Sequence, residues 1–457
     1  MALFSRNSNG AAQSANGTGA PPLFGSDQSL ILSDQSFLEL KVRLHRRLLD
    51  VLKLALIESV PYEQFAAETS EIVAELLTTE TTPLNDRERR QITKDILDEL
   101  LGLGPLEPLL KDPTIADILV NTYEMVFVER RGRLELSPVR FKDNDHLLRI
   151  INKMVTAVGR RIDEAQPVVD ARLADGSRIN AVIQPVAVDG PLLSIRKFAK
   201  IPFDLAKLVE VGTLTSEIGH FLEAMVRGRI SVLISGGTGT GKTTLLNAMS
   251  KAIDHRERIV TIEDAAELQL QQPHVARMET RPPNTEGKGE ITQRDLVKNA
   301  LRMRPDRIIL GEVRSGEAFD MLQAMNTGHE GSLSTIHANT PRDAVSRLEQ
   351  MIGMAGLEMS PRTIRSQIAS AVNVVIQIGR WIDGRRRITS IQEITGMEGD
   401  VVSMHEIFHY HRISTSAEGE IHGHFLATGI RPKFASELET LGITFHPNFF
   451  DPKRRLE

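Results

Sequence analysis

The sequence predicts an α/β fold, and two patterns indicate this class. In the second half of the chain, short apolar runs typical of buried strands alternate with segments of helical periodicity. The runs cover residues 230–234, 258–262, 307–310, 332–336 and 373–378. The first run leads into a glycine-rich sequence, and a helix-forming segment without Pro or Gly follows. We therefore expect a largely parallel sheet with covering helices and a ligand site at the carboxyl ends of its strands.

Composition limits the possible classes of protein. A chain of 457 residues, 41% hydrophobic and 25% charged, is typical of a globular protein with two or three domains. The 55 basic and 60 acidic residues give a net charge of −5, which disfavours nucleic acid as the main partner. The absence of cysteine excludes disulfides and Cys-based metal sites.

The sequence contains no targeting or membrane signal that we recognise. No apolar run approaches the ~20 residues needed to span a bilayer, and the N-terminus does not resemble a signal peptide. We expect a cytoplasmic protein that reaches a membrane only through partners.

The first hundred residues divide into two predicted regions. Residues 1–30 are rich in Ser, Asn, Gly and Pro and are expected to be a disordered tail. Residues 31–101 predict a helical bundle, because leucine recurs every fourth residue from Leu44 to Leu56 and Asn85 with Glu88 matches a capping box.

An α+β domain is predicted over residues 102–205. Its expected elements are a strand pair at 125–128 and 133–136 around Arg131-Gly132, a helix at 147–158, a hairpin of 168–173 and 178–183 joined by Asp175-Gly176, and a strand at 192–195. The strand-rich domain that follows is assigned to residues 206–425. Beyond about residue 400 the pattern is less regular, and 426–457 is expected to be a C-terminal tail with a loose end at 447–457.

The glycine-rich sequence fits G-x-x-x-x-G-K-[ST] at every fixed position, and it is a candidate phosphate-binding loop. It comprises Gly236, Gly237, Thr238, Gly239, Thr240, Gly241, Lys242 and Thr243, with Thr244 next. Glycines allow the backbone N–H groups to surround a polyphosphate, and the following helix N-terminus adds positive potential. Lys242 would reach the outer phosphates and the Thr243 hydroxyl would ligate Mg²⁺. The motif therefore predicts binding of a nucleoside triphosphate, with ATP and Mg²⁺ as ligands.

Acidic residues follow two of the predicted strands. Glu312 stands at a Walker-B position after residues 307–310, where Asp is usual, so it would hold Mg²⁺ through water. Glu263 ends residues 259–262 and is the candidate to orient or deprotonate the attacking water. A surface carboxylate at a strand end is the alternative interpretation of Glu312.

Two histidines flank the predicted strand at residues 332–336. His337 lies at its carboxyl end, from which it can reach a phosphate oxygen. His329 lies before the strand and is expected to order its loop.

Together these motifs resemble the secretion ATPases of the type II/type IV superfamily. Their order, with a Walker A, an Asp box at 261–264, a Walker B at 311–314 and a His box at 329–337, is that of the superfamily. The sequence from 301–307 through 325–329 is most similar to the CpaF-type motors of tight-adherence (Tad/Flp) pili. The resemblance covers about residues 90–400.

The resemblance implies a RecA-like C-terminal domain, a PAS-like preceding domain and a ring of six subunits with ATP at the domain interfaces. It implies that Glu263 is the catalytic glutamate, Glu312 the metal partner and His337 the γ-phosphate sensor. Arg172, Arg178 and Arg196 lie in segments similar to the family's arginine-bearing strands, where guanidinium groups neutralise transition-state charge. Ordinary surface charge on a hairpin is the alternative for these arginines.

The leading hypothesis is a homohexameric Mg²⁺-dependent ATPase motor, peripheral at the inner membrane, that drives Tad/Flp pilus assembly, or also retraction, through inner-membrane platform proteins. Its alternative is a type IV secretion ATPase for export of protein or DNA. A nucleic-acid translocase is disfavoured by the acidic balance, and a nucleotide switch without turnover is disfavoured by the two acidic motifs.

Overall fold

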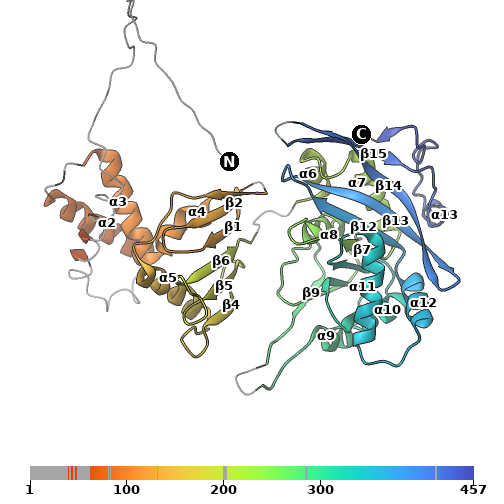
Figure 1. Ribbon diagram of the computed structural model, residues 1–457, viewed down its shortest axis with the longest axis horizontal. Helices are drawn as coiled ribbons and strands as arrows, with labels where there is room; N and C mark the ends of the chain where they lie inside the picture. Colours follow the sequence, from red (N-terminus) through yellow and green to blue (C-terminus); the bar gives the residue numbers. More distant parts are fainter. Residues whose placement is uncertain are drawn as a thin grey trace, which may run out of the picture. The chain divides into compact units, whose positions relative to one another are not determined.

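The computed structural model describes residues 40, 43–44, 47–48, 62–80, 82, 84–130, 132–198, 203–283, 287–416 and 419–456. The chain divides into two compact units, with the boundary between Pro105 and Leu106 (Figure 1). The tail predicted at residues 1–30 and the leucines at 52 and 56 lie outside the described residues. No helix among the described residues is long and apolar enough to cross a bilayer.

The first unit is helical where it is described. Helices α2 (Tyr62–Thr78) and α3 (Asp86–Leu101) share an apolar core with two of the predicted leucines, Leu44 and Leu48, and with Leu40, which was not predicted. The core comprises Leu40, Leu44, Leu48, Val73, Leu77, Ile92 and Ile96. The predicted capping box begins α3: the Asn85 side chain accepts from the Glu88 N–H, and the Glu88 carboxylate accepts from the Asn85 N–H, each at 2.9 Å.

The second unit contains a six-stranded antiparallel sheet with the strand order β3-β2-β1-β6-β5-β4. The elements of this region are η2 (Gly104–Leu106), α4 (Glu107–Lys111), β1 (Ile115–Val120), β2 (Val126–Arg130), β3 (Arg133–Leu136), α5 (Asn144–Ala157), β4 (Val168–Arg172), β5 (Arg178–Val182) and β6 (Leu192–Arg196). The predicted turns are present, with Gly132 at φ 79° and Gly176 at φ 90°, a backbone region that favours glycine. Strand β1, which pairs with both β2 and β6, was not predicted.

A ten-stranded sheet follows in the same unit, with the order β16-β15-β14-β13-β12-β7-β11-β10-β8-β9. Neighbouring strands are parallel in the part β12-β7-β11-β10-β8-β9. Neighbouring strands are antiparallel in the part β16-β15-β14-β13-β12. The strands are β7 (Val232–Ser235), β8 (Ile259–Glu263), β9 (Val275–Glu279), β10 (Arg307–Val313), β11 (Leu333–Ile336), β12 (Val374–Arg380), β13 (Arg386–Glu398), β14 (Val401–Thr415), β15 (Ile421–Ala427) and β16 (Arg455–Leu456). The five predicted strands are the core of its parallel part.

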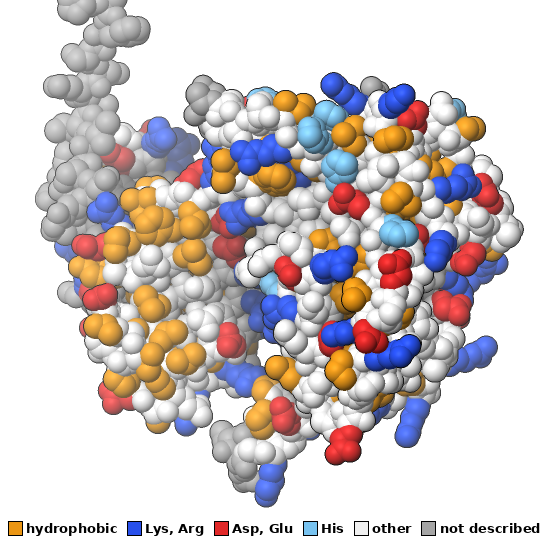
Figure 2. Space-filling model, turned by 45° about the vertical axis from the view of Figure 1, so that its right-hand side comes forward, with side chains coloured by type: hydrophobic (Ala, Val, Ile, Leu, Met, Phe, Trp, Pro, Cys, Tyr) orange, Lys and Arg blue, Asp and Glu red, His pale blue; other side chains and the backbone are white. Residues whose placement is uncertain are grey.

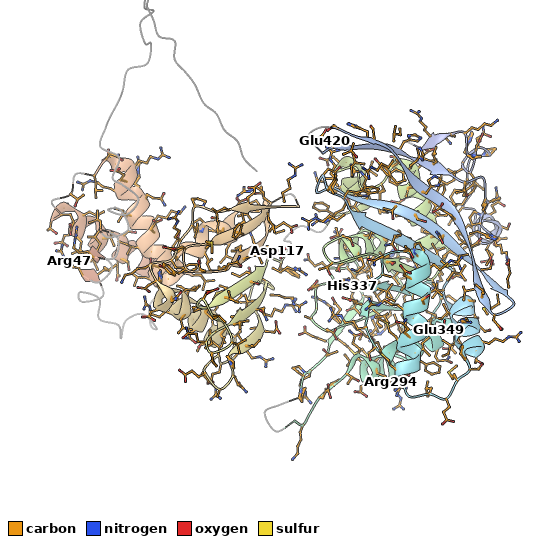
Figure 3. All side chains as sticks on the ribbon, viewed as in Figure 1. Arg47, Asp117, Arg294, His337, Glu349 and Glu420 are labelled. Carbon is orange, nitrogen blue, oxygen red and sulfur yellow. The ribbon has the colours of Figure 1, made fainter. Side chains whose placement is uncertain are left out.

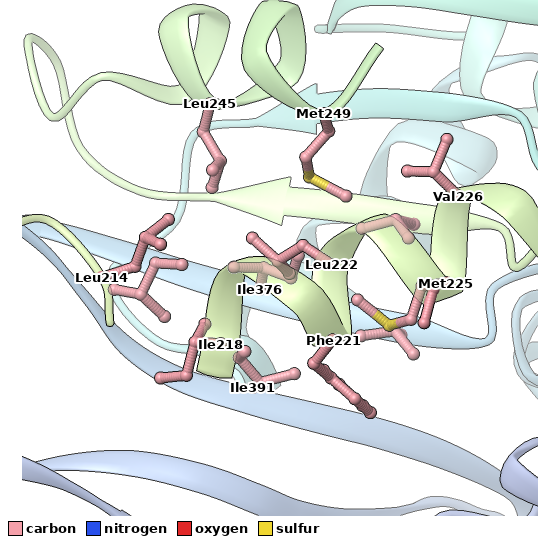
Figure 4. Packing of buried hydrophobic residues seen from close by; sticks show 14 of the residues in the cluster. Leu214, Ile218, Phe221, Leu222, Met225, Val226, Leu245, Met249, Ile376 and Ile391 are labelled. Atoms are coloured by element: carbon pink, nitrogen blue, oxygen red, sulfur yellow. The ribbon is translucent and has the colours of Figure 1, made fainter. Parts of the chain in front are cut away.

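Helices cover both faces of this sheet. On one face lie α6 (Leu205–Glu210), α7 (Ser216–Arg227) and α8 (Lys242–Ser250), and Figure 4 shows how the apolar side chains of α7 pack there. On the other face lie α9 (Gln293–Ala300), α10 (Glu317–Asn326), α11 (Pro341–Met354) and α12 (Pro361–Ala371). Successive residues of β7 alternate between the two cores, as expected of a doubly covered strand. The α/β class with a RecA-like nucleotide domain is confirmed.

The C-terminal region corrects two expectations. Strand β14 is 15 residues long, and α13 (Ala435–Thr440) and β16 follow β15, so the chain beyond residue 400 is regular. The end of the chain is not loose, because Phe449 and Phe450 are buried against Phe221 of α7 and Phe408 of β14, with ring centroids 5.7 Å apart for Phe408 and Phe449. Buried aromatic area fixes this segment.

Candidate active site

The predicted phosphate loop connects β7 to α8, as the motif requires. Gly241 caps α8 at φ 98° and Gly239 lies at φ 69°. A Cβ atom at Gly236 would lie 2.4 Å from the Ile378 carbonyl oxygen, so this position has no room for a side chain. Of the threonines, Thr238 is exposed in the loop, Thr240 donates to the Gly237 carbonyl at 2.9 Å, and Thr243 and Thr244 lie in the first turn of α8. The loop therefore has the backbone of an anion-binding nest.

Lys242 is buried at the start of α8 and is turned onto the loop. Its Nζ donates to the carbonyls of Gly236 at 3.1 Å and Gly237 at 2.9 Å. Burial lowers the pKa of Lys242 to about 8, although the Glu312 carboxylate acts in the opposite direction. An ammonium with so little solvent gains strongly from an anion, which makes Lys242 a natural phosphate contact.

The sheet order brings His337 between the loop and the Walker-B strand. Strand β11 lies between β7 and β10, and His337 follows β11 (Figure 3). Its ring nitrogens lie 3.3 and 3.4 Å from Lys242 Nζ, and its Nε2 lies 3.0 Å from Glu312 Oε1. Burial, and then the Lys242 charge, lower the pKa of His337 below its ordinary value. Lys242, His337 and Glu312 thus form one chain of contacts.

Glu312 lies where the regular pairing of β10 with β11 is interrupted, and this is also where it contacts His337. The pairing of β10 with β11 shifts between Leu310 and Val313, so Gly311 and Glu312 lie in an irregularity of the kind that re-aims side chains at active sites. The second Glu312 oxygen accepts from Arg314 Nη2 at 2.9 Å, and Arg314 Nη1 donates to Asp264 Oδ2 at 2.9 Å. Arg314 therefore links the two acidic motifs. Arg314 lies within the Walker-B sequence at 311–314 but was not predicted as a site residue.

Glu263 is the buried carboxylate at the end of β8, on the other side of β10. Its Oε2 accepts from the backbone N–H groups of Glu267 at 2.6 Å and Leu268 at 2.8 Å. Its Oε1 is buried and has no hydrogen-bond partner among the residues that the structure describes. Burial raises the pKa of Glu263. A Cβ at Gly311 would lie 2.8 Å from Glu263 Cγ, so glycine makes room for this side chain.

The residues present fit Mg²⁺ bound together with a nucleotide. Among the described residues, no group of three or more His, Asp or Glu side chains could hold a metal ion by itself. Mg²⁺ commonly takes only one or two protein ligands and completes its shell with phosphate oxygens and water. The Thr243 hydroxyl and the Glu312 carboxylate, both oxygen donors, are the candidates to hold it.

The three predicted arginines lie in one register row of the six-stranded sheet. Arg172 is opposite Arg178, and Arg178 is opposite Arg196. Each is paired with an acid: Arg172 with Glu279 at 3.2 Å, Arg178 with Glu267 at 2.7 Å and Arg196 with Asp117 at 3.2 Å (Figure 3 labels Asp117). Arg172 also donates to the Ala266 carbonyl. Two of the arginines therefore contact the segment that follows Glu263, and their described contacts do not include Lys242, Glu312 or His337.

The other predicted histidine and a surface group of histidines lie apart from this chain of contacts. His329 precedes β11, with Nδ1 3.3 Å from the Ala324 carbonyl at the end of α10. On β14 and β15, the rings of His409 and His411 are 6.4 Å apart and those of His411 and His424 are 5.7 Å apart. Figure 2 shows histidine side chains gathered on one face of the molecule. His409, His411 and His424 belong to the antiparallel part of the sheet, which does not carry the phosphate loop.

These features define a P-loop nucleotide-binding protein of RecA-like fold, with acidic residues and a histidine at the carboxyl ends of its parallel strands. The chain matches the family described as "Type II/IV secretion system protein" over residues 99–406. It therefore belongs to the type II/IV secretion system protein family.

Known proteins related to the chain include transfer and secretion proteins. It is 41% identical over 324 residues to a Mycobacterium tuberculosis protein named "Putative conjugal transfer protein", covering 70% of this chain and 92% of that protein. It is 30% identical over 331 residues to the type IV secretion system protein VirB11 of Bartonella quintana, covering 64% and 92%. Among solved structures, the VirB11 ATPase of the Brucella suis type IV secretion system in complex with sulphate matches with 29% identity and a TM-score of 0.35, covering 63% of this chain and 95% of that chain.

Proposed function

We propose that the protein is a Mg²⁺-dependent ATPase motor that works as a homohexamer and drives Tad/Flp pilus assembly. It would act at the cytoplasmic side of the inner membrane, through contacts with membrane-embedded platform proteins. The observation that supports hydrolysis most directly is the contact chain from Lys242 through His337 to Glu312, because it joins the phosphate loop to the Walker-B position.

In this proposal the residues of the site have separate roles. Lys242 and the loop N–H groups bind the β- and γ-phosphates, and Mg²⁺, when bound through Thr243 and Glu312, neutralises phosphate charge. His337 contacts the γ-phosphate and reports its presence to Glu312. Glu263 orients the attacking water and accepts its proton as the water oxygen bonds to the γ-phosphorus and ADP leaves. Within the described part of the chain Glu263 Oε1 has no hydrogen-bond partner, and this, together with the raised pKa of Glu263, suits a general base.

Arg172, Arg178 and Arg196 are proposed to complete the site by neutralising transition-state charge. Their acidic partners hold them as pairs on the six-stranded sheet, and the pairs with Glu279 and Glu267 lie close to the segment after Glu263. A change in position of this sheet would exchange those partners for phosphate.

The second candidate function is type IV secretion of protein or DNA, and the named relatives favour it. One relative is called a conjugal transfer protein and another a type IV secretion system protein. In the native host, replacing the gene by a Lys242→Ala allele separates the two candidates. Loss of surface pili with unchanged export supports the pilus motor, and loss of export or conjugation with intact pili supports the secretion motor.

Steady-state ATP hydrolysis by the purified full chain tests the enzymatic part. Lys242→Ala removes the buried phosphate contact, so we expect at least a hundredfold loss of kcat/KM, about the scale of losing one transition-state donor. Lys298→Ala is the matched control, because this exposed lysine of α9 carries the same charge away from the site. Equal activity of Lys242→Ala and Lys298→Ala would reject the proposal. Sedimentation with and without nucleotide tests the homohexamer.

A further inference from the structure

Three charged side chains outside the sequence motifs meet beside the phosphate loop. Glu129 lies on β2, Arg380 ends β12 and Arg386 begins β13. One Glu129 oxygen accepts from Arg386 Nη2 at 3.1 Å and the other accepts from Arg380 Nη1 at 3.3 Å. Glu129 is buried, with only 8% of its surface exposed. It is therefore a carboxylate enclosed by two guanidinium groups.

Arg386 also contacts the phosphate loop directly. Its Nε donates to the Gly239 carbonyl oxygen at 2.8 Å. The Gly239 carbonyl and the Thr240 N–H belong to one planar peptide group and point in opposite directions. A donor that fixes the carbonyl therefore also fixes the direction of the N–H. Orientation of the loop N–H groups is what allows the nest to bind phosphate.

Two turns also contact each other, one between β2 and β3 and the other between β12 and β13. Arg380 donates to the carbonyl of Gly132, in the turn between β2 and β3. A Cβ at Gly132 would lie only 2.5 Å from the Gly384 carbonyl oxygen, in the turn between β12 and β13. Both turns belong to the second unit. The six-stranded sheet thus reaches the phosphate loop through Glu129 and Arg386, and its β2–β3 turn lies against the β12–β13 turn.

We propose that Glu129 and Arg386 are positioning residues for the bound nucleotide. Glu129 orients Arg386, and Arg386 holds the Gly239–Thr240 peptide so that its N–H faces the phosphates. This role rests on the proposed ATPase function. It makes nucleotide affinity depend on the six-stranded sheet, which must lie against the phosphate loop for Glu129 to orient Arg386. By linkage, bound nucleotide strengthens the same contact.

The test is ADP binding to the full chain by titration calorimetry, together with KM and kcat for ATP. We expect Arg386→Gln to weaken ADP binding about tenfold and Glu129→Gln to weaken it at least about threefold, the range of coupling between contacting residues. The double variant should bind as weakly as Arg386→Gln alone. KM should rise with kcat at saturating ATP unchanged, which marks loss of positioning for binding and not of chemistry. The ADP affinity of Arg386→Lys should lie between those of wild type and Arg386→Gln, since an ammonium lacks the planar set of donors with which a guanidinium contacts two acceptors.

The control variant is Glu135→Gln. Glu135 is an exposed residue of the neighbouring strand β3, and its loss changes net charge by the same amount without touching Arg386. Unchanged melting temperatures show that each variant folds. Wild-type ADP affinity in Glu129→Gln, tighter binding in that variant, or additive effects in the double variant would each overturn the positioning role. If wild-type protein bound no nucleotide, the proposed ATPase function itself would be rejected, so the two failures are distinguishable.

Discussion

The ten-stranded sheet encloses several of its charged side chains, whereas the six-stranded sheet carries its arginines at the surface. Arg307 at the start of β10 is fully buried and pairs with Glu257 through two hydrogen bonds of 2.7 and 3.0 Å. Lys242 and Glu263 are buried near the opposite ends of the parallel strands. By contrast, the side chain of Arg196 is 56% exposed in its pair with Asp117.

This difference separates charges that burial holds in one arrangement from charges that remain available to a ligand or a neighbouring surface. A buried ion pair is costly to break, because the remaining partner loses both solvent and counter-charge. An exposed pair contributes little and can exchange partners readily. The enclosed site therefore stays assembled, while the row of Arg172, Arg178 and Arg196 can change its contacts without unfolding either sheet.

The largest stability effect should come from breaking the buried pair. Glu257→Gln leaves the Arg307 guanidinium buried with reduced compensation, so we expect a loss of about 3 kcal/mol or more in the free energy of unfolding. Urea unfolding followed by the fluorescence of Trp381, the only tryptophan of the chain, measures this in the ten-stranded sheet.

Breaking the exposed pair of Arg196 and Asp117 should change the free energy of unfolding far less. Asp117→Asn removes the partner of Arg196, and we expect a change below about 1 kcal/mol, because solvent replaces the lost charge. Circular dichroism during urea unfolding measures this change. A loss as large as that of Glu257→Gln would show that the six-stranded sheet also depends on its arginine pairs, and the contrast between the sheets would not hold.

The smallest predicted signal is a fraction of a proton taken up on nucleotide binding. With a pKa of about 8, free Lys242 is mostly neutral at pH 8.5 and mostly protonated at pH 7. A bound polyphosphate favours the ammonium, so binding at pH 8.5 should take up about 0.8 proton, against about 0.1 at pH 7. Calorimetry in buffers of different ionisation enthalpy measures the uptake. An uptake that does not increase from pH 7 to pH 8.5 would show that Lys242 is already charged in the free protein.

The sign of the stability effect of Lys242 follows from the same shift. Its folded pKa lies below the ordinary 10.5, so its contribution is most favourable above pH 10.5 and is lost as pH falls through about 8. At neutral pH the buried charge of Lys242 therefore destabilises the nucleotide-free protein, and a bound anion offsets that effect. Nucleotide should accordingly stabilise the protein more at pH 7 than at pH 9.

Local patterns in the sequence predicted much of the fold. The phosphate loop, the hairpin at Gly176 and the capping box at Asn85 were predicted because glycine conformation and capping side chains act over a few residues. Strand β1 and the antiparallel strands β13 to β16 were missed or underestimated. Their pairing depends on partners distant in sequence, and Phe449 and Phe450 become buried only when β14 and α7 are in place.

The sequence motifs predicted which side chains meet at the ends of the parallel strands, and the roles assigned to them stay predictions. Lys242, His337 and Glu312 meet because parallel strands end at one edge of the sheet. Arg314, Arg386 and Glu129 could not be predicted in the same way, since an isolated charge in a sequence is most often a solvated surface residue. Their importance appears only from the contacts that cross from one strand to another.

The most direct test of the account is single-turnover ATP hydrolysis by Glu263→Gln, because the central claim is that the enclosed groups at the strand ends do the chemistry. The substitution keeps the shape of the side chain and removes the proton acceptor. We expect ATP binding within about threefold of wild type and hydrolysis slower by about 10² to 10⁴. Hydrolysis at the wild-type rate would contradict the account, and would place the proton acceptor elsewhere.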